Sequence, residues 1–251
     1  MAEQTVVCDL DGVVYVGDQA IPGAREALMR IGRSARVVFC TNNSFRRRAD
    51  VADKIRTVVG YPAAVDQVFT SAMAAARLAA GSSGVLVVGG PGVVEALDLR
   101  SIPVVEDRHG CDAVVVGLDL HLTYEKLSEA TLAVRAGARL IATNHDATFP
   151  TPEGLKPGGG AIAAAIETAT GVIAQVAGKP HSAMHELLAE EIGEGEVWMV
   201  GDRADTDLAM ARAAGWLGAL VRTGVPREGR DAPDLDVADL TAFADALDQR
   251  R

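Results

Sequence analysis

The sequence predicts an α/β fold, in which a parallel sheet carries helices on both faces and a second, smaller αβ domain is inserted into the chain. Short Val-rich runs alternate with Ala-rich amphipathic stretches along the 251 residues, a pattern typical of buried parallel strands joined by helices. The composition agrees, because 49% of the residues are hydrophobic but only 4% are aromatic, so Val, Ala, Leu and Ile must form the core. The stretch from Thr41 to Lys179 is far longer than one strand–helix–strand unit needs, which indicates the insertion.

The individual elements are predicted from runs of apolar residues and from the residues that end them. Strands are expected at 5–8, 35–40, 67–70, 85–88, 102–105, 113–116, 139–142, 173–177, 197–200 and 218–222. Helices are expected at 24–31, 46–59, 93–97, 124–136, 161–169, 181–192, 207–214 and 240–247, with a further Ala-rich helix capped by Ser71. The segment 143–160 contains three prolines and four glycines and is expected to be irregular.

The first strand carries the most informative polar residues. Its apolar run ends in Asp9 and Asp11, and Gly12 follows. Two carboxylates at the end of a buried strand are costly unless a positive charge neutralises them. Oxygen ligands of this kind suit Mg²⁺. The alternative is a pair of solvated turn aspartates.

Four predicted strands end in polar or charged side chains. They are Asp9/Asp11, Thr41/Asn42, Lys179 and Asp202/Asp207. If the four strands are parallel neighbours, these side chains lie on the same side of one sheet, where α/β folds bind ligands. The predicted domains are therefore a core formed by 1–77 and 179–251 and an inserted cap at 78–178.

Charge and cysteine content exclude several classes of function. The formal charge of −10 disfavours nucleic acid and anionic membranes, so an anionic substrate needs a local positive group. Cys8, Cys40 and Cys111 show no disulfide or metal spacing, which favours reduced thiols in the cytoplasm. We expect no signal peptide, because Asp9 comes so early in the sequence, and no membrane span, because no apolar run reaches the required length. A homodimer is left open.

Four motifs of the chain resemble, in order and spacing, those of the haloacid dehalogenase-like (HAD-like) phosphatases. In chain order they are Asp9-Leu10-Asp11-Gly12-Val13, Thr41-Asn42-Asn43, Gly178-Lys179-Pro180 and Gly201-Asp202-Arg203-Ala204-Asp205-Thr206-Asp207. The insertion resembles the cap of subfamily IIA, which includes nucleotide, phosphoglycolate, pyridoxal phosphate and glycerol phosphate phosphatases. Segment 143–160 is similar to that subfamily's ATNPDxxFP…GxG pattern, but has His145 where Pro or Arg is more usual. The resemblance implies a Rossmann-like core with a C2-type cap.

The resemblance also implies a role for each motif residue. Asp9 would form an aspartyl-phosphate, and Asp11 would act as general acid and base. Asp9, the backbone carbonyl of Asp11, and Asp202 would bind Mg²⁺. The residues that bind phosphate would be Thr41, Asn42, Asn43 and Lys179, and Asp207 would orient Lys179 or a metal-bound water. The predicted enzyme is a Mg²⁺-dependent phosphatase of small organic phosphate monoesters.

Segment 143–151 is predicted to contact the part of the substrate that leaves with oxygen. Asn144, His145 and Asp146 can all form hydrogen bonds to a hydroxyl-bearing group. The alternative is that Asn144 and Asp146 only cap local backbone turns. His145 is not needed for a turn and is therefore the better probe.

Simpler interpretations stand beside several of these assignments. Segment 41–44 is alternatively a turn and helix cap, and Lys179 a solvated loop lysine. Asp205 is expected only to cap a helix, and Gly89–Gly92 lacks the spacing of a dinucleotide loop and is interpreted as structural. Gly158–Gly160 is expected to let the backbone turn sharply. The i, i+4 pair His181 and His185 has no third ligand and is expected on a helix surface.

Two other functions use the same strand-end aspartate. The first is phosphotransfer, as in a phosphomutase, but the spacing from Asp9 to Thr41 leaves no room for the cap that the mutases of this superfamily insert there. The second is a non-catalytic regulatory module that is phosphorylated on aspartate or binds a nucleotide. Asp11 argues against it, because a retained acid and base shortens the lifetime of a phosphoenzyme. The sequence does not identify the substrate.

Overall fold

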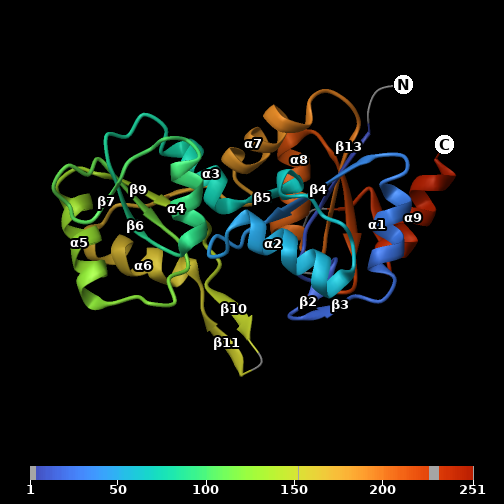
Figure 1. Cartoon of the computed structure of the whole chain (residues 1–251), viewed down its shortest axis with the longest axis horizontal. Coiled ribbons are helices and arrows are strands. Elements are labelled where there is room, and N and C mark those ends of the chain that lie inside the picture. Colours follow the sequence, from blue (N-terminus) through green and yellow to red (C-terminus); the bar gives the residue numbers. More distant parts are fainter. Residues whose placement is uncertain (1–3, 152, 226–231, 251) are drawn as a thin grey trace. The chain divides into compact units, whose positions relative to one another are not determined.

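The computed structural model describes residues 4–151, 153–225 and 232–250, and the chain divides into two compact units (Figure 1). Unit 1 consists of Met1–Thr41, Arg48–Phe69 and Leu188–Arg251, and unit 2 of Asn42–Arg47 and Thr70–Leu187. Residues 42–47, 70–77 and 179–187 thus belong to unit 2, whereas the sequence predicted them in the core domain. The predicted domain boundaries stay a proposal.

Unit 1 is built on a six-stranded sheet. Its strands are β1 (Thr5–Cys8), β4 (Arg36–Thr41), β5 (Val68–Thr70), β13 (Val197–Gly201), β14 (Leu217–Val221) and β15 (Leu235–Val237). The order across the sheet is β15-β14-β13-β1-β4-β5, and β1 pairs in parallel with both β13 and β4. Counted along the chain this is the doubly wound order 3-2-1-4-5-6, in which the direction of winding reverses between β1 and β13. The predicted Rossmann-like core is therefore confirmed.

Helices cover both faces of this sheet. They are α1 (Ala24–Ile31), α2 (Arg48–Lys54), which continues into a π-helical turn at Ile55–Val59, α8 (Ala209–Ala214) and α9 (Leu240–Gln249). On one face α1 and α9 lie side by side (Figure 1), and their buried Leu28 and Phe243 join a core with Phe39 and Trp198. A smaller cluster of Ala204, Leu208 and Leu220 packs separately from that core.

Unit 2 contains a second parallel sheet of five strands. Its strands are β6 (Val85–Val88), β7 (Val104–Val105), β8 (Ala113–Val116), β9 (Arg139–Ala142) and β12 (Gln175–Val176). The order is β12-β9-β8-β6-β7, and every neighbouring pair is parallel. This sheet is also doubly wound, and its winding reverses between β6 and β8.

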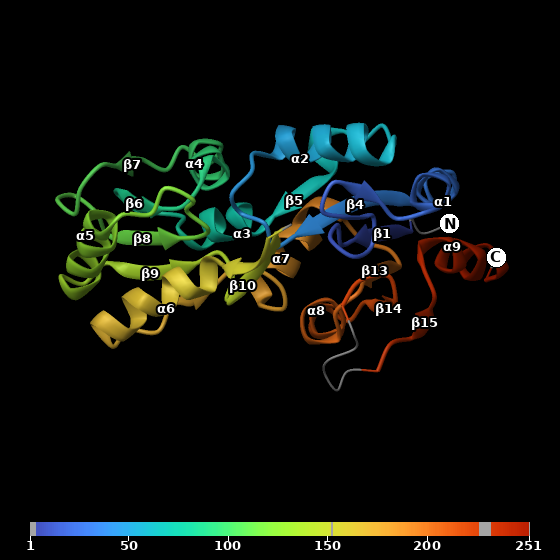
Figure 2. The ribbon, with the colours of Figure 1, turned by 90° about the horizontal axis from the view of Figure 1, so that it is seen from below.

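The helices of unit 2 alternate along the chain with the strands of this sheet, as predicted. They are α3 (Ser71–Leu78), α4 (Pro91–Asp98), α5 (Tyr124–Arg135) and α6 (Gly159–Thr170), and α7 (Ser182–Ile192) begins in unit 2 and ends in unit 1. Buried residues of α5 and α6 form one core with the sheet, whereas α3 and α4 contact each other (Figure 2). Among the described residues α5 and α6 are the longest helices, at 12 residues each, and none there has the length and apolarity that crossing a membrane requires.

Two local predictions were wrong. Segment 143–160 is not irregular throughout, because β10 (Thr148–Thr151) and β11 (Gly154–Pro157) pair as an antiparallel hairpin. Proline and glycine disfavour a helix, but they are compatible with a hairpin turn, where Gly154 has φ +123°. The side chain that caps α3 belongs to Thr70, which accepts from the backbone N–H of Met73 at 3.4 Å, and not to Ser71.

Four further elements were not predicted at all. A short antiparallel hairpin joins β2 (Tyr15–Val16) and β3 (Gln19–Ala20), a 3₁₀ turn spans Val65–Gln67, and β15 lies at the edge of the sheet of unit 1. All four are two or three residues long, which is too short for a periodic apolar pattern to appear in the sequence.

Candidate active site

Three buried carboxylates meet at the point where the winding of the unit 1 sheet reverses. Asp9 follows β1, Asp202 follows the neighbouring β13, and Asp207 lies in the π-helical turn Ala204–Leu208. Their exposed fractions are 8%, 4% and 0%, and one oxygen of each lies within 4.8 Å of the others. In the described part of the chain they form a group of acidic side chains close enough to share a metal ion. An all-oxygen set of buried carboxylates suits a hard divalent cation.

The backbone around Asp202 is shaped to hold its carboxylate. The N–H of Val225 donates to Oδ2 at 2.9 Å, and the hydroxyl of Thr223 donates to the carbonyl of Gly12 at 2.6 Å. Gly12 has φ +84°, and a Cβ at this position would lie 2.7 Å from Asp202 Cγ. A Cβ at Gly224 would also meet the Asp202 carboxylate. Glycine is therefore required at both positions for the carboxylate to keep its place.

Asp207 and Asp205, which both follow Asp202 in the chain, have different surroundings. Asp207 Oδ2 accepts from the backbone N–H of Arg203 at 3.1 Å, and a Cβ at Gly201 would meet its carboxylate. Asp205 points instead to the guanidinium of Arg203, with Nη2–Oδ2 at 2.6 Å, and this hydrogen bond lowers the pKa of Asp205. Asp205 was expected only to cap a helix; its side chain forms an ion pair with Arg203.

Cys8 lies next to the carboxylate cluster and is fully buried. Burial, with a smaller contribution from the charge of Asp9, raises the pKa of its thiol to about 12. The thiol therefore stays protonated near neutral pH, as expected for a core residue and not for a nucleophile.

Two further predicted residues lie near the carboxyl ends of the same strands. Thr41 ends β4 and is 3% exposed, two residues beyond the Cys8–Phe39 pair in the register of β1 and β4. The side chain of Asp11 is exposed and lies in the turn after β1, where Gly12 donates to the carbonyl of Tyr15. Of the predicted metal ligands, the carboxylates of Asp9 and Asp202 come together, and the carboxylate of Asp207 joins them. The backbone carbonyl of Asp11 stays a predicted ligand.

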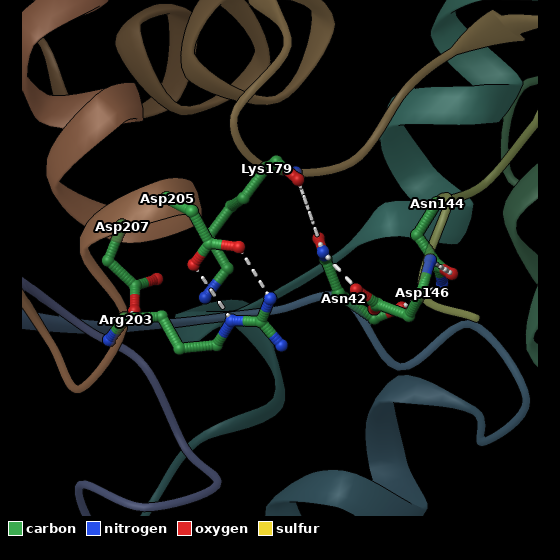
Figure 3. A network of polar contacts seen from close by, with 7 residues as sticks. All are labelled: Asn42, Asn144, Asp146, Lys179, Arg203, Asp205 and Asp207. Atoms are coloured by element: carbon green, nitrogen blue, oxygen red, sulfur yellow. Dashed lines mark hydrogen bonds and ion pairs between the residues drawn. The ribbon is translucent and has the colours of Figure 1, made fainter. Parts of the chain in front are cut away.

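Lys179 and Asn42 belong to unit 2. The strand that precedes Lys179 is β12, which pairs with β9 in the five-stranded sheet and not with the strands of unit 1. Three of the four polar strand ends therefore share one sheet, and Lys179 follows a strand of the other. Spacing along the chain does not reveal which sheet a strand of two residues joins. Lys179 is 5% exposed, and both its backbone polar groups bind the side chain of Asn42 (Figure 3).

The remaining predicted residues of unit 2 make contacts within that unit. Asn43 Oδ1 accepts from the backbone N–H groups of Phe45 and Arg46 at 3.0 and 3.3 Å, which closes a turn. Buried Asn144 donates to the carbonyl of Asn42 at 2.7 Å and accepts from the backbone of Asp146 at 3.1 Å. These contacts match the alternative in which Asn43 and Asn144 organise the backbone, and their contact with substrate stays a prediction.

His145 and Asp146 are more accessible than Asn144. His145 is exposed, and its Nε2 lies 3.4 Å from Glu167 Oε1 on α6. Asp146 Oδ2 accepts from Asn42 Nδ2 at 3.4 Å (Figure 3). Substrate recognition by either residue is a prediction that these contacts leave open.

In two glycine-rich segments, Gly89–Gly92 and Gly158–Gly160, other parts of the chain pack directly against the glycine backbone. A Cβ at Gly90 would meet the ring of Phe45, and the N–H of Gly92 donates to the carbonyl of Phe45 at 2.9 Å. The residues after Thr41 thus pack against the loop that follows β6, which agrees with the structural interpretation of Gly89–Gly92. At Gly160 a Cβ would meet the backbone of His145, so close packing of the chain explains this glycine.

Residues 223–225, which follow β14, belong to the site but were not predicted from the sequence. They hold the carbonyl of Gly12 and the carboxylate of Asp202 through backbone and hydroxyl groups. The available signal was a Thr-Gly pair just after an apolar run, at the carboxyl end of another strand of the same sheet. The residues beyond it, 226–231, lie outside the described part of the chain.

Comparison with known proteins agrees with this architecture. A family model described as haloacid dehalogenase-like hydrolase matches residues 6–102, and one described as HAD-hydrolase-like matches residues 176–245. The chain is 42% identical over 230 residues to the D-glycerol 3-phosphate phosphatase of Mycobacterium tuberculosis, a match that covers 88% of this chain and 63% of that relative's length. It is 40% identical over 206 residues to an acid sugar phosphatase of Staphylococcus saprophyticus, covering 80% and 79% of the two chains.

A solved structure matches nearly the whole chain. The glycerol phosphate phosphatase of Mycobacterium tuberculosis in complex with magnesium has a TM-score of 0.90 and 36% sequence identity, over 96% of this chain and 76% of that one. A doubly wound sheet with acidic residues at its switch point, interrupted by a second α/β unit, defines a class of hydrolases. The chain belongs to the haloacid dehalogenase-like hydrolase family and is of the subfamily IIA type.

Proposed function

We propose that this chain is a Mg²⁺-dependent phosphatase that hydrolyses small organic phosphate monoesters through an aspartyl-phosphate on Asp9. The observation that carries the proposal is the group of three buried carboxylates at the switch point of the unit 1 sheet. Three buried negative charges repel one another strongly unless a cation neutralises them. The family to which the chain belongs and its phosphatase relatives support the same class of reaction.

The donor set fits Mg²⁺ better than a softer metal. Asp9, Asp202 and Asp207 offer oxygen ligands without Cys or His, and each carboxylate is at least nine-tenths buried. We propose that Asp9 and Asp202 bind the ion, together with the Asp207 carboxylate or the backbone carbonyl of Asp11. When bound, Mg²⁺ offsets the charge that would otherwise repel a phosphate dianion from the aspartates.

The chemical steps need one nucleophile and one proton carrier. A carboxylate oxygen of Asp9 attacks phosphorus while the ester oxygen leaves, taking a proton from Asp11. Asp11 then accepts a proton from water as that water attacks the phosphorus, which releases inorganic phosphate and restores the Asp9 carboxylate. The exposed side chain of Asp11 suits a group that exchanges protons with a leaving alcohol and with water.

The phosphoryl oxygens need hydrogen-bond donors, because negative charge spreads over them in the transition state. We assign this role to the Thr41 hydroxyl, the backbone N–H of Asn42 and the Lys179 ammonium, with Asn43 shaping the turn between them and α2. A chain with a formal charge of −10 draws in an anionic substrate only through such local groups, and the buried lysine provides the positive charge.

The substrate class is proposed from the relatives. The mycobacterial relative is named as a D-glycerol 3-phosphate phosphatase and the staphylococcal one as an acid sugar phosphatase, and this chain spans 63% of the length of the former. We therefore expect phosphate esters of small polyols and sugars to be among the substrates. We propose that the inserted cap, through Asn144, His145 and Asp146, selects among them. A location in the cytoplasm stays a prediction from the cysteine content.

The decisive experiment measures phosphate release from a panel of glycerol phosphate, sugar phosphates, phosphoglycolate, pyridoxal phosphate and nucleoside monophosphates. With Mg²⁺ we expect turnover, and after chelation with EDTA none. Ca²⁺ is expected to inhibit, because its larger coordination shell draws in both oxygens of Asp9. No turnover of any ester, or full activity after chelation, would refute the proposal.

A pair of matched variants tests the nucleophile. Asp9→Asn keeps the shape of the side chain but removes the nucleophile, so turnover should fall below a few per cent of the wild type while the fold is kept. The control is Asp205→Asn, which removes a neighbouring carboxylate outside the cluster and should leave kcat near the wild-type value. Equal activities of the two variants would exclude the covalent step on Asp9.

A further inference from the structure

The side chain of Asn42 bridges both backbone polar groups of Lys179. Its Oδ1 accepts from the Lys179 N–H at 2.8 Å, and its Nδ2 donates to the Lys179 carbonyl at 3.2 Å (Figure 3). We propose that the Asn42 amide is a positioning residue that sets the place of the Lys179 ammonium, in addition to any contact that the Asn42 backbone makes with phosphate. This inference rests on the proposed function, in which Lys179 binds the phosphoryl group.

The backbone of Asn42 is itself held by hydrogen bonds. Its carbonyl accepts two hydrogen bonds of 2.7 Å, one from the hydroxyl of Ser71 at the start of α3 and one from the amide of Asn144 after β9. Main chain and side chain of Asn42 are therefore both anchored. Asn42, Ser71, Asn144 and Lys179 all belong to unit 2, so these contacts hold the Lys179 backbone from within one unit.

The loop that carries Lys179 has little room to move. A Cβ at the preceding Gly178 would lie 2.5 Å from Asn42 Oδ1, 2.6 Å from the carbonyl of Thr143 and 3.1 Å from Ser71 Cβ. The side chain of Lys179 is buried as well, at 5% exposed. Because the Lys179 side chain is enclosed, a shift of its backbone also moves its ammonium group. An exposed, flexible lysine side chain could instead change rotamer and keep the ammonium in place.

An amide is needed at position 42 and a carboxylate does not replace it. The same Nδ2 that donates to Lys179 also lies 3.4 Å from Asp146 Oδ2. A carboxylate in its place has no proton for the Lys179 carbonyl and repels Asp146. Asn42→Asp is nearly isosteric with the wild type, so it tests the donor without opening a cavity.

The test is a double-mutant cycle on kcat/KM for the best substrate of the panel. We expect Asn42→Ala to lower kcat/KM by about 10- to 100-fold, the usual range for a residue that orients a binding group. In the Lys179→Ala background the same change should cost less than about threefold, because the group that Asn42 positions is already gone. Effects that multiply in the double variant would overturn the inference.

Two further measurements separate positioning from a loss of stability. Asn42→Asp should weaken inhibition by inorganic phosphate to nearly the same extent as Lys179→Ala. The matched control is Gln67→Ala, since the Gln67 amide also bridges two backbone groups, accepting from Ala64 N–H and donating to the Val37 carbonyl, both at 2.8 Å. It lies before β5 and near the start of β4, away from the carboxyl ends, so it should lower Tm but leave kcat/KM within about twofold.

The outcomes distinguish the proposed phosphatase function from the proposed role of the Asn42 side chain. A wild-type protein without phosphatase activity would remove the proposed function. An active wild type with an additive cycle, or unchanged phosphate inhibition in Asn42→Asp, would remove only the role of the Asn42 side chain. A loss of kcat/KM in Gln67→Ala equal to that in Asn42→Ala would assign both amides to stability.

Discussion

Gly12→Ala tests whether the loop after β1 holds the carboxylate of Asp202 in place. Two effects act on the variant. Gly12 has φ +84°, a conformation that costs an L residue roughly 1–2 kcal/mol, partly offset by about 0.4–1 kcal/mol through the unfolded state. The new Cβ also lies 2.7 Å from Asp202 Cγ, about 0.7 Å closer than the 3.4 Å of ordinary contact, so the carboxylate must retreat.

Gly17→Ala isolates the second effect. Gly17 has φ +57°, but a Cβ there meets no described atom within 4 Å. The backbone strain destabilises both variants. Only Gly12→Ala also overpacks the structure, which lowers the free energy of unfolding by a further roughly 1–3 kcal/mol. For a chain of this length that difference lowers Tm by about 2–12 °C relative to Gly17→Ala.

Activity and metal binding should separate the variants further. Displacing a catalytic carboxylate by most of an ångström is expected to lower kcat/KM by about 100-fold in Gly12→Ala, whereas Gly17→Ala should stay close to the wild type. Thermal melts with and without Mg²⁺ report binding without turnover, and the rise in Tm on adding Mg²⁺ should be lost only in Gly12→Ala. Equal activity and equal Mg²⁺ response of the two variants would refute the assignment of this loop to Asp202.

Three more predictions follow from other parts of the structure. His145→Ala should change kcat/KM unequally across the phosphate panel, by ~1–3 kcal/mol between substrates, and an equal loss on all would mean that its contact with Glu167 serves stability. The hydrogen bond from Arg203 holds the pKa of Asp205 below its ordinary value of 3.8. The ionised Asp205 therefore stabilises the fold fully above pH 3.8, and this stabilisation is lost as the pH falls through the folded pKa. Thermal melts from neutral to acid pH should show that the Tm deficit of Asp205→Asn shrinks below pH 3.8. In the native protein a thiol reagent at mild alkaline pH should label Cys111 alone, because Cys111 is partly exposed, whereas Cys8 and Cys40 are buried. After unfolding all three cysteines should react. Rapid labelling of Cys8 and Cys40 in the native protein would contradict their burial.

Much of the secondary structure could be read from the sequence because its causes are local. The strands at 5–8, 85–88, 113–116 and 139–142 and the helix at 24–31 have the predicted limits. Each is an apolar run or a helical face closed by a glycine or a polar residue, and such patterns do not depend on distant partners. The hairpin in segment 143–160 was missed because pairing between two short strands leaves no periodic apolar signal.

The sequence by itself determined the family, the doubly wound core and the strand ends that carry Asp9, Thr41 and Asp202, since parallel strands place their carboxyl ends at one edge. Only the tertiary structure decided that Asp207 joins the buried carboxylates and that Lys179 follows a strand of the second sheet. It also decided that the Asn42 amide binds the Lys179 backbone, over a separation of 137 positions in the chain. Contacts of this kind depend on how helices and loops pack, and spacing along the chain carries no information about that packing.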